Sequence, residues 1–136
     1  MTKTALMMIK PDAVRRDIHN AILACLPIFQ LELVNLQRRK LTRQEAGALY
    51  VTHCDKEYFS GLIDFTISGE VLLMEVRTTE ALDLDASQVV RGAVTKIREM
   101  FGTYKVTREN VIHGSDSEES ARREVKLFFP KSIDAY

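Results

Sequence analysis

One stretch near the start of the chain constrains the fold more than any other: Thr4-Ala5-Leu6-Met7-Met8-Ile9-Lys10-Pro11-Asp12. Its first six residues form a β-type run of ordinary strand length, and Lys10-Pro11-Asp12 interrupts that run. Proline and aspartate both suit the first turn of a helix, because that turn leaves N–H groups without partners and favours negative charge. The stretch therefore predicts a strand that passes through a turn directly into a helix.

The first helix is expected to stop early. Its apolar residues recur at helical spacing, at Val14, Ile18, Ile22, Cys25 and Phe29. Pro27 removes a helical hydrogen bond, so the helix should kink or end near Leu26. The next segment, Leu31 to Gln37, alternates well enough to predict a second strand, although its pattern blurs at Val34.

The middle of the chain predicts three helices and one strand. Thr42 and Glu45 fit the capping box that starts a helix. Glu70 to Arg77 is rich in apolar and β-branched residues, which indicates a strand. The other two segments are a short helix over Phe59 to Ile67, and a long amphipathic helix over Ala86 to Phe101 that Gly102 ends.

A second distinctive stretch lies near the end of the chain: Asn110-Val111-Ile112-His113-Gly114-Ser115-Asp116-Ser117. Its apolar pair suits a brief buried strand, its glycine permits a sharp turn, and the three polar residues that follow can each cap a helix. Ser117 to Glu124 then predicts a short helix, and Val125 to Phe129 predicts a last strand.

In chain order these elements give β-α-β-β-α-β with one or two extra helices. This order is typical of an α+β, ferredoxin-like fold, in which an antiparallel sheet carries helices on one face, here with additional short helices. The chain has 136 residues, of which 46% are hydrophobic, and it shows no repeat or linker. It should therefore form a single domain, residues 1–136.

Charge and composition limit the possible partners. Nineteen basic and nineteen acidic side chains give no net charge, which argues against a stable complex with nucleic acid held mainly through phosphates. No apolar span reaches membrane length and no signal-peptide pattern precedes Thr4, so we expect a cytoplasmic protein without membrane contact. Cys25 and Cys54 form no C-x-x-C pair, and both are expected to be reduced and buried.

His113 is the best candidate for chemistry among the three histidines. A placed imidazole, largely neutral near pH 7, can serve as a nucleophile, as an acid or base, or as a metal ligand. The local pattern leaves this open, because a histidine beside a turn is more often structural than catalytic. His19, on the polar side of the first helix, and His53, beside Cys54, are interpreted as surface or packing residues.

Two motifs are more specific together than either is alone. They are Met8-Ile9-Lys10-Pro11-Asp12-Ala13-Val14 and the Asn110 to Ser117 stretch. With both motifs in this order and at this spacing, the chain resembles the nucleoside diphosphate kinases. The resemblance runs from Thr4 to about Phe129 and includes Tyr58-Phe59-Ser60-Gly61-Leu62 at a matching offset. It implies the same ferredoxin-like fold that the order of elements predicts.

The resemblance implies a ping-pong phosphotransferase. The enzyme would pass the terminal phosphate of a nucleoside triphosphate to a nucleoside diphosphate through a phosphorylated histidine, which by motif match is His113. Magnesium would arrive with the nucleotide and be held chiefly by phosphate oxygens, so no cage of protein carboxylates is expected. Asp116 is accordingly expected to stabilise a helix start rather than to bind metal.

Motif matches also imply roles for residues around the histidine. They are Lys10 for phosphate, Tyr50 for the wall of the site, Tyr58 for stacking on the base, and Asn110 for the sugar or phosphate. Ser115 and Glu124 match a hydrogen-bonded pair, in which Glu124 would also accept a hydrogen bond from His113 and fix the attacking tautomer. Each assignment has a structural alternative, such as a surface lysine, a core tyrosine, a turn asparagine, a helix cap or a solvated carboxylate.

The chain departs from the family in its long helix. The usual proline-containing loop, with T-N-P or T-D-P and then P-G-T-I-R, has no counterpart here. Arg91 and Arg98 are the candidates for the two phosphate-binding arginines, and their seven-residue spacing would place them on one helix face. A competing alignment assigns Arg98 to the first arginine and leaves the second unmatched. Either arginine could also be solvated, and either Thr95 or Thr103 could replace the family's threonine.

The missing loop also bears on assembly and on competing functions. Because that loop helps to build higher oligomers in relatives, we expect a homo-oligomer that is a dimer or tetramer rather than a hexamer. The strongest alternative function is a non-catalytic nucleotide-binding or scaffold homologue with a remodelled phosphate site. An RNA-binding module and a serine hydrolase fit less well, since the chain has neither an R-G-F-G-F-V type run nor a G-x-S-x-G elbow.

Overall fold

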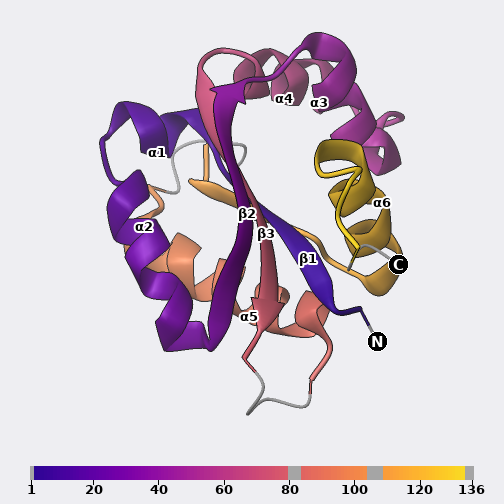
Figure 1. Cartoon of the computed structure of the whole chain (residues 1–136). Helices are drawn as coiled ribbons and strands as arrows, with labels where there is room; N and C mark the ends of the chain where they lie inside the picture. The colour runs from indigo at the N-terminus through magenta and orange to yellow at the C-terminus, as the bar shows by residue number, and fades with distance from the viewer. Residues whose placement is uncertain (1, 80–83, 104–108, 134–136) are drawn as a thin grey trace.

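The computed structural model describes residues 2–79, 84–103 and 109–133 (Figure 1). Within them lies a four-stranded antiparallel sheet in the order β2-β3-β1-β4. The strands are β1 (Thr4–Ile9), β2 (Leu31–Lys40), β3 (Glu70–Thr78) and β4 (Ile112–Gly114). The helices are α1 (Pro11–Arg15), α2 (His19–Cys25), α3 (Arg43–Leu49), α4 (Phe59–Thr66), α5 (Ala86–Phe101) and α6 (Glu118–Phe128), with 3₁₀ turns η1 (Leu26–Phe29) and η2 (Val51–His53). The predicted α+β class with an antiparallel sheet is confirmed.

The interior strand β1 is paired on both sides. Its Met8 lies opposite Leu73 of β3 and opposite His113 of β4. All six residues of β1 are buried. A strand covered on both faces favours apolar side chains at successive positions, which explains why β1 is apolar from Ala5 to Ile9 rather than alternating. The pairing with β4 anchors His113 to the best-buried strand of the molecule.

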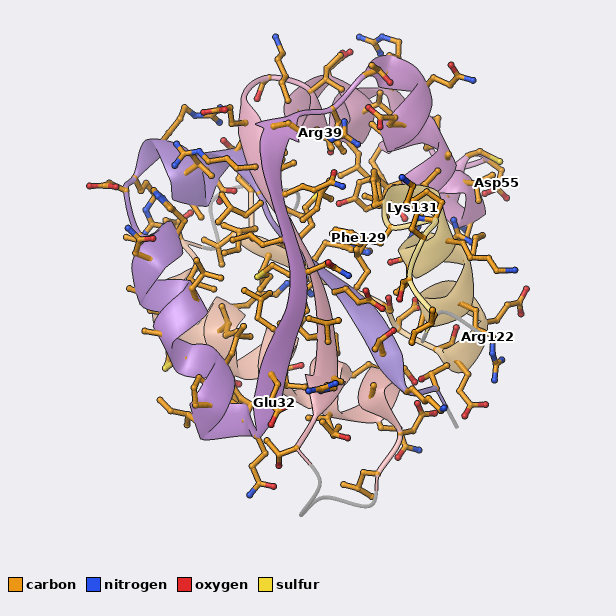
Figure 2. The ribbon with its side chains drawn as sticks, viewed as in Figure 1. Glu32, Arg39, Asp55, Arg122, Phe129 and Lys131 are labelled. Atoms are coloured by element: carbon orange, nitrogen blue, oxygen red, sulfur yellow. The ribbon has the colours of Figure 1, made fainter. Side chains whose placement is uncertain are left out.

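Two hydrophobic cores lie on opposite faces of the sheet. Helices α1, α2 and α5 cover one face, and the additional helices α3, α4 and α6 cover the other (Figure 1). Met7 of β1 and Ile97 of α5 belong to the first core, and Met8 belongs to the second. Figure 2 shows Phe129 inside the second core, whereas Arg122 of α6 points outward.

Two predicted elements need correction. The first helix is broken into α1 and α2 near Asp17, whose φ of 57° is a left-handed conformation that a continuing helix does not contain. Val125 to Phe129 is not a strand, because it lies almost wholly in α6, where Val125 and Phe128 are buried at helical spacing. The fourth strand is instead β4, which carries His113.

Two local features of the sequence have clear structural counterparts. Thr42 and Glu45 form the predicted capping box, in which each side chain accepts a hydrogen bond from the backbone N–H of the other. The blurred pattern at Val34 marks a β-bulge, since the pairing with β3 shifts register between Leu33 and Asn35. The strand continues past this bulge to its end at Lys40.

The cysteines differ from expectation in their burial. Cys25, the last residue of α2, is half-buried, and Cys54 is exposed, so neither is a core residue. Both are free thiols. In the part of the chain that the structure describes, no helix combines the length and the apolar character needed to cross a membrane.

Candidate active site

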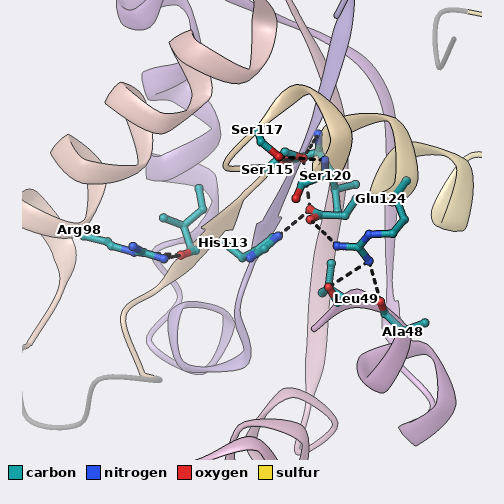
Figure 3. Close-up of polar contacts among 11 residues, drawn as sticks. Ala48, Leu49, Arg98, His113, Ser115, Ser117, Ser120 and Glu124 are labelled. Carbon is teal, nitrogen blue, oxygen red and sulfur yellow. Dashed lines mark hydrogen bonds and ion pairs between the residues drawn. The ribbon is translucent and has the colours of Figure 1, made fainter. Parts of the chain in front are cut away.

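His113 lies in the middle of β4, and a carboxylate holds its imidazole from one side. Nε2 of His113 lies 2.7 Å from Oε1 of Glu124 on α6 (Figure 3). The histidine side chain is 15% exposed and the glutamate side chain 3%. An ionised carboxylate can only accept a hydrogen bond, so Nε2 carries the proton and Nδ1 keeps a lone pair. The contact therefore selects one tautomer of the ring.

Glu124 is held by further donors. The Ser115 hydroxyl donates to the same oxygen of Glu124 at 3.2 Å, and Nη2 of Arg123 lies 3.4 Å from the other oxygen (Figure 3). Arg123 also donates through Nη1 to the carbonyl oxygen of Ala48 at 2.8 Å. Since Ala48 lies in the last turn of α3, the guanidinium joins this helix to α6 and to the carboxylate behind His113.

The segment before His113 forms a tight and strained turn. Val111 has a φ of 67°, a conformation that β-branched residues rarely adopt, and its two neighbours are joined by a 2.9 Å backbone hydrogen bond. Oδ2 of Asp12 accepts the Val111 N–H at 3.1 Å, and the Val111 carbonyl accepts the Lys10 N–H at 2.8 Å. Burial raises the pKa of the Asp12 carboxyl. These contacts hold the turn and fix the direction of β4.

Gly114 serves close packing rather than the expected sharp turn. Among the described glycines none has a positive φ, so no turn here requires glycine. A Cβ at position 114 would lie 2.6 Å from a methyl group of Val90 and 2.6 Å from one of Val94. The absence of a side chain thus lets β4 lie directly against α5, the helix that carries Arg91 and Arg98.

A cavity of about 730 Å³ lies beside His113. It is lined by Lys10, Tyr50, His53, Tyr58, Leu62, Arg91, Val94, Thr95, Arg98, Asn110, His113, Gly114 and Asp116. Seven of the nine residues that the resemblance assigns to the site are in this lining. The other two, Ser115 and Glu124, lie behind the imidazole. One cavity therefore brings the separate motifs of the sequence together.

Cationic side chains face this cavity from two elements. Arg91 and Arg98 both come from the continuous helix α5, and Lys10 directly follows β1. Arg98 donates from Nε and Nη2 to the Ile112 carbonyl oxygen at 3.2 and 2.9 Å, which places its guanidinium beside His113. Burial, and then the charge of Arg98, lower the pKa of Lys10 to about 7. Burial also lowers the pKa of Arg98. An anion in the cavity would relieve this concentration of positive charge.

Aromatic side chains also line the cavity. The Tyr50 ring meets the His113 ring edge-on, at 5.3 Å between centroids and 80° between planes. Nζ of Lys10 lies 5.8 Å from the centroid of Tyr50. Burial raises the pKa of the Tyr50 phenol, so this side chain is neutral. Tyr58 is 51% exposed, and its hydroxyl lies 2.6 Å from Nδ1 of His53.

One residue of this lining, His53, was not predicted from the sequence. His53 was expected at the surface or in packing, but it lines the cavity. Its position three residues after Tyr50 at a helix end was an available signal, since residues at this spacing share one side. Thr95 lines the cavity as well, whereas Thr103 does not, so the structure distinguishes two threonines that sequence spacing left equivalent.

Asp116 is not the capping residue of the helix that follows it. The N-cap of α6 is Ser117, whose hydroxyl accepts the Ser120 N–H at 3.1 Å. Asp116 lies one residue earlier, where its side chain lines the cavity. Three adjacent residues could each cap a helix, and their composition alone did not show which one does so.

Comparison with known proteins agrees with this geometry. The family model described as nucleoside diphosphate kinase matches residues 3–133. The chain belongs to the nucleoside diphosphate kinase family. It is 35% identical over 130 residues to the nucleoside diphosphate kinase of Thermobifida fusca, covering 92% of this chain and 95% of that one. It is 38% identical over 128 residues to the nucleoside diphosphate kinase of Desulforamulus reducens, covering 90% of this chain and 85% of that one.

Solved structures of nucleoside diphosphate kinases share the fold. A family member from Babesia bovis matches with a TM-score of 0.81 and 30% identity, over 96% of this chain and 90% of that one. The Aquifex aeolicus enzyme matches with a TM-score of 0.77 and 28% identity, over 93% and 94% of the two chains. The activity is therefore that of a nucleoside diphosphate kinase, a nucleotide-binding phosphotransferase.

Proposed function

We propose that His113 is the nucleophile and that the kinase works by a ping-pong mechanism. Nδ1 of His113 attacks the γ-phosphorus of a nucleoside triphosphate, and a P–N bond forms as the bond to the β–γ bridging oxygen breaks. The nucleoside diphosphate leaves with that electron pair. A second nucleoside diphosphate reverses these steps with its terminal phosphate oxygen as nucleophile. The observation that carries this proposal is the 2.7 Å contact of Nε2 with Glu124, which leaves the Nδ1 lone pair for attack.

Glu124 and Ser115 support the nucleophile. The imidazole becomes positively charged as its nitrogen attacks phosphorus, and the buried carboxylate of Glu124 stabilises that charge. Ser115 donates to the same carboxylate oxygen and is itself fully buried, which keeps the pair in place. Glu124 thus both fixes the tautomer and offsets the charge that develops during transfer.

Lys10, Arg91 and Arg98 bind the phosphate chain in this proposal. They bring positive charge to the cavity beside His113, where charge on the transferred phosphoryl oxygens needs to be neutralised. A charge-assisted hydrogen bond of this kind contributes about 1.5–3 kcal/mol. Bound phosphate would raise the pKa of Lys10 above its value of about 7, because a nearby negative charge favours the protonated amine.

Tyr50, Tyr58 and Asn110 complete the nucleotide site. Tyr58 stacks on the nucleobase, which tolerates different bases because every base presents a π-face. Asn110 contacts the sugar or a phosphate, and Tyr50 forms the wall between Lys10 and His113. All these side chains line the one cavity, so a single bound nucleotide can contact them together.

The side chains in the cavity suit magnesium that enters with the nucleotide. Among the described lining residues Asp116 is the one carboxylate, and the other charged groups are cationic or histidine. Phosphate oxygens would therefore supply most of the ligands. When bound, Mg²⁺ neutralises charge on the phosphates and thereby favours phosphoryl transfer.

We further infer that this enzyme is an atypical member of its family that works without the proline-containing loop. Support comes from α5, a continuous helix that presents Arg91, Thr95 and Arg98 to the cavity, and from the absence of proline between Pro27 and Pro130. We propose a single domain over residues 1–136 that acts in the cytoplasm as a dimer or tetramer rather than a hexamer.

Labelling with γ-labelled ATP tests the mechanism. With magnesium present, the purified protein should form an acid-labile, base-stable phosphoprotein, and unlabelled GDP should then remove the label as GTP. His113→Ala should abolish labelling, while His19→Ala, a matched change in α2 outside the cavity, should retain it. Label retained by a folded His113→Ala protein would refute the proposal. Label on the wild type that GDP cannot remove would instead indicate a non-catalytic homologue.

A further inference from the structure

Two aromatic side chains of the cavity wall are joined by a short hydrogen bond that the phosphoryl transfer does not use. Nδ1 of His53 lies 2.6 Å from the hydroxyl of Tyr58, with the two ring centroids 5.8 Å apart and the planes at 50°. His53 ends η2, and Tyr58 directly precedes α4. Both residues line the cavity, so the bond links two turns of its wall.

The two partners differ in how firmly the fold holds them. Tyr58 is 51% exposed, so packing alone leaves its ring free to adopt several rotamers. His53 is half-buried, and its ring meets the buried Tyr50 ring edge-on at 6.4 Å and 62°. The backbone N–H of His53 also donates to the Tyr50 carbonyl oxygen at 2.9 Å. The buried Tyr50 ring therefore restrains His53, and His53 in turn restrains the more exposed ring of Tyr58.

We propose that His53 is a positioning residue of the nucleotide site, which orients the Tyr58 ring for stacking before the nucleobase arrives. The inference rests on the proposed function, in which Tyr58 carries the base. In this arrangement the phenol O–H donates to Nδ1 of His53, and Nε2 carries the imidazole proton. Fixing the ring in advance lowers the entropic cost of binding, because fewer rotamers are lost when the base stacks.

This role predicts an effect on binding with no effect on chemistry. The His53–Tyr58 bond holds the base platform and not the transferred phosphoryl group, so it acts equally on the ground state and the transition state. Loss of the bond should raise KM for nucleotides about three- to tenfold and leave kcat unchanged, since one hydrogen bond of typical strength is lost. A residue that only stabilised the fold would not separate KM from kcat in this way.

Three variants isolate the bond. Tyr58→Phe keeps the stacking ring and removes the hydroxyl, while His53→Phe keeps a ring against Tyr50 and removes the acceptor. Each variant should raise KM for ATP and for GDP, and the double variant should resemble either single variant because all three lack the same bond. His19→Phe, a matched change in α2 outside the cavity, should leave KM unchanged.

A phosphoryl donor without a base separates this inference from the proposed function. Phosphoramidate transfers its phosphoryl group to an imidazole and releases ammonia, so it should label His113 equally in the wild type and in all the variants. If the wild type takes label from neither donor, the proposed function fails. If the wild type is labelled but both single variants keep the wild-type KM, or if their effects add in the double variant, the role of His53 is refuted.

Discussion

At the scale of single residues, the charge of Lys10 depends on its neighbours. Burial and Arg98 lower its pKa to about 7, so a rise in pH through about 7 removes a charge that attracts phosphate. We expect kcat/KM to fall across this interval. Arg98→Gln removes the second cause of the shift, so the pKa of Lys10 should rise and the fall should move to higher pH.

This shift can be measured as pH profiles of kcat/KM for the two proteins between about pH 6 and about pH 9. Because both profiles use the same nucleotides, titration of the substrate phosphates affects them equally. An inflection at the same pH in wild type and in Arg98→Gln would contradict the assigned cause.

Sequence motifs identified the residues that gather at the cavity better than they indicated its geometry. The two motifs singled out His113 and Lys10, and the structure brings both to one cavity. They did not indicate His53, whose approach to Tyr50 and Tyr58 depends on the 3₁₀ turn between α3 and α4. Such a contact requires the path of the backbone in three dimensions, which single-residue patterns do not contain.

At the scale of elements, the contact between β4 and α5 depends on Gly114. Gly114→Ala would place a methyl group 2.6 Å from Val90 and Val94, so strand and helix must separate. We expect the free energy of unfolding to fall by about 1–3 kcal/mol, as overpacking usually costs. Activity should fall too, because Arg91 and Arg98 would move with α5 relative to His113.

Gly92→Ala is the matched control for this change. A Cβ at Gly92 of α5 meets no atom within 4 Å, so the substitution should leave stability unchanged or raise it by up to about 1 kcal/mol through helix propensity. Urea unfolding followed by circular dichroism measures both variants. Equal stability of the Gly114→Ala and Gly92→Ala proteins would show that the strand–helix contact tolerates a side chain.

At this scale, helices and strands were predictable from the sequence where the apolar residues followed a single consistent pattern. Strands β1 and β3 and helix α5 have long, consistent runs and lie close to their predicted bounds. The strand predicted over Val125 to Phe129 was wrong, because five largely apolar residues suit a buried strand and a buried helix equally. In the structure this segment packs on β1 as part of helix α6. The break at Asp17 also escaped prediction, since apolar spacing continues across it.

At the scale of the whole molecule, a buried carboxylate joins the end of the chain to the sheet. Glu75 of β3 is fully buried and accepts hydrogen bonds from Thr4 at 2.7 Å, Asn35 at 2.8 Å and Ser132 at 2.6 Å. Ser132→Ala removes one donor and should lower the free energy of unfolding by about 1–3 kcal/mol. Ser120→Ala, which keeps the N–H used by the α6 cap, should change it by less than about 0.5 kcal/mol.

Urea unfolding of these two serine variants tests whether the segment after α6 stabilises the whole fold. Equal midpoints and equal slopes for Ser132→Ala and the wild type would show that the segment contributes nothing to the cooperative unit. A lower midpoint for Ser132→Ala alone would place the segment within that unit.

The α+β class and the antiparallel sheet were predictable from the order of the elements. The sequence was expected to place helices on one face of the sheet, whereas the structure has helices and a core on both faces. The burial of β1 on both sides is the reason for its run of apolar residues. The sequence did not indicate which helices cover which face of the sheet, because Met7 and Met8 are equally apolar and yet face opposite cores. That division is settled by tertiary packing, and it puts α5 on one face of the sheet and Glu124 of α6 on the other.

The continuity of α5 has a consequence for the speed and selectivity of nucleotide exchange. Arg91 and Arg98 both project from one continuous helix and not from a loop that closes over the ligand. They therefore line the cavity before a nucleotide enters. Turnover then need not wait for a slow opening movement. Discrimination among mono-, di- and triphosphates would rest on a fixed spacing of charges, without the added selectivity that induced fit provides.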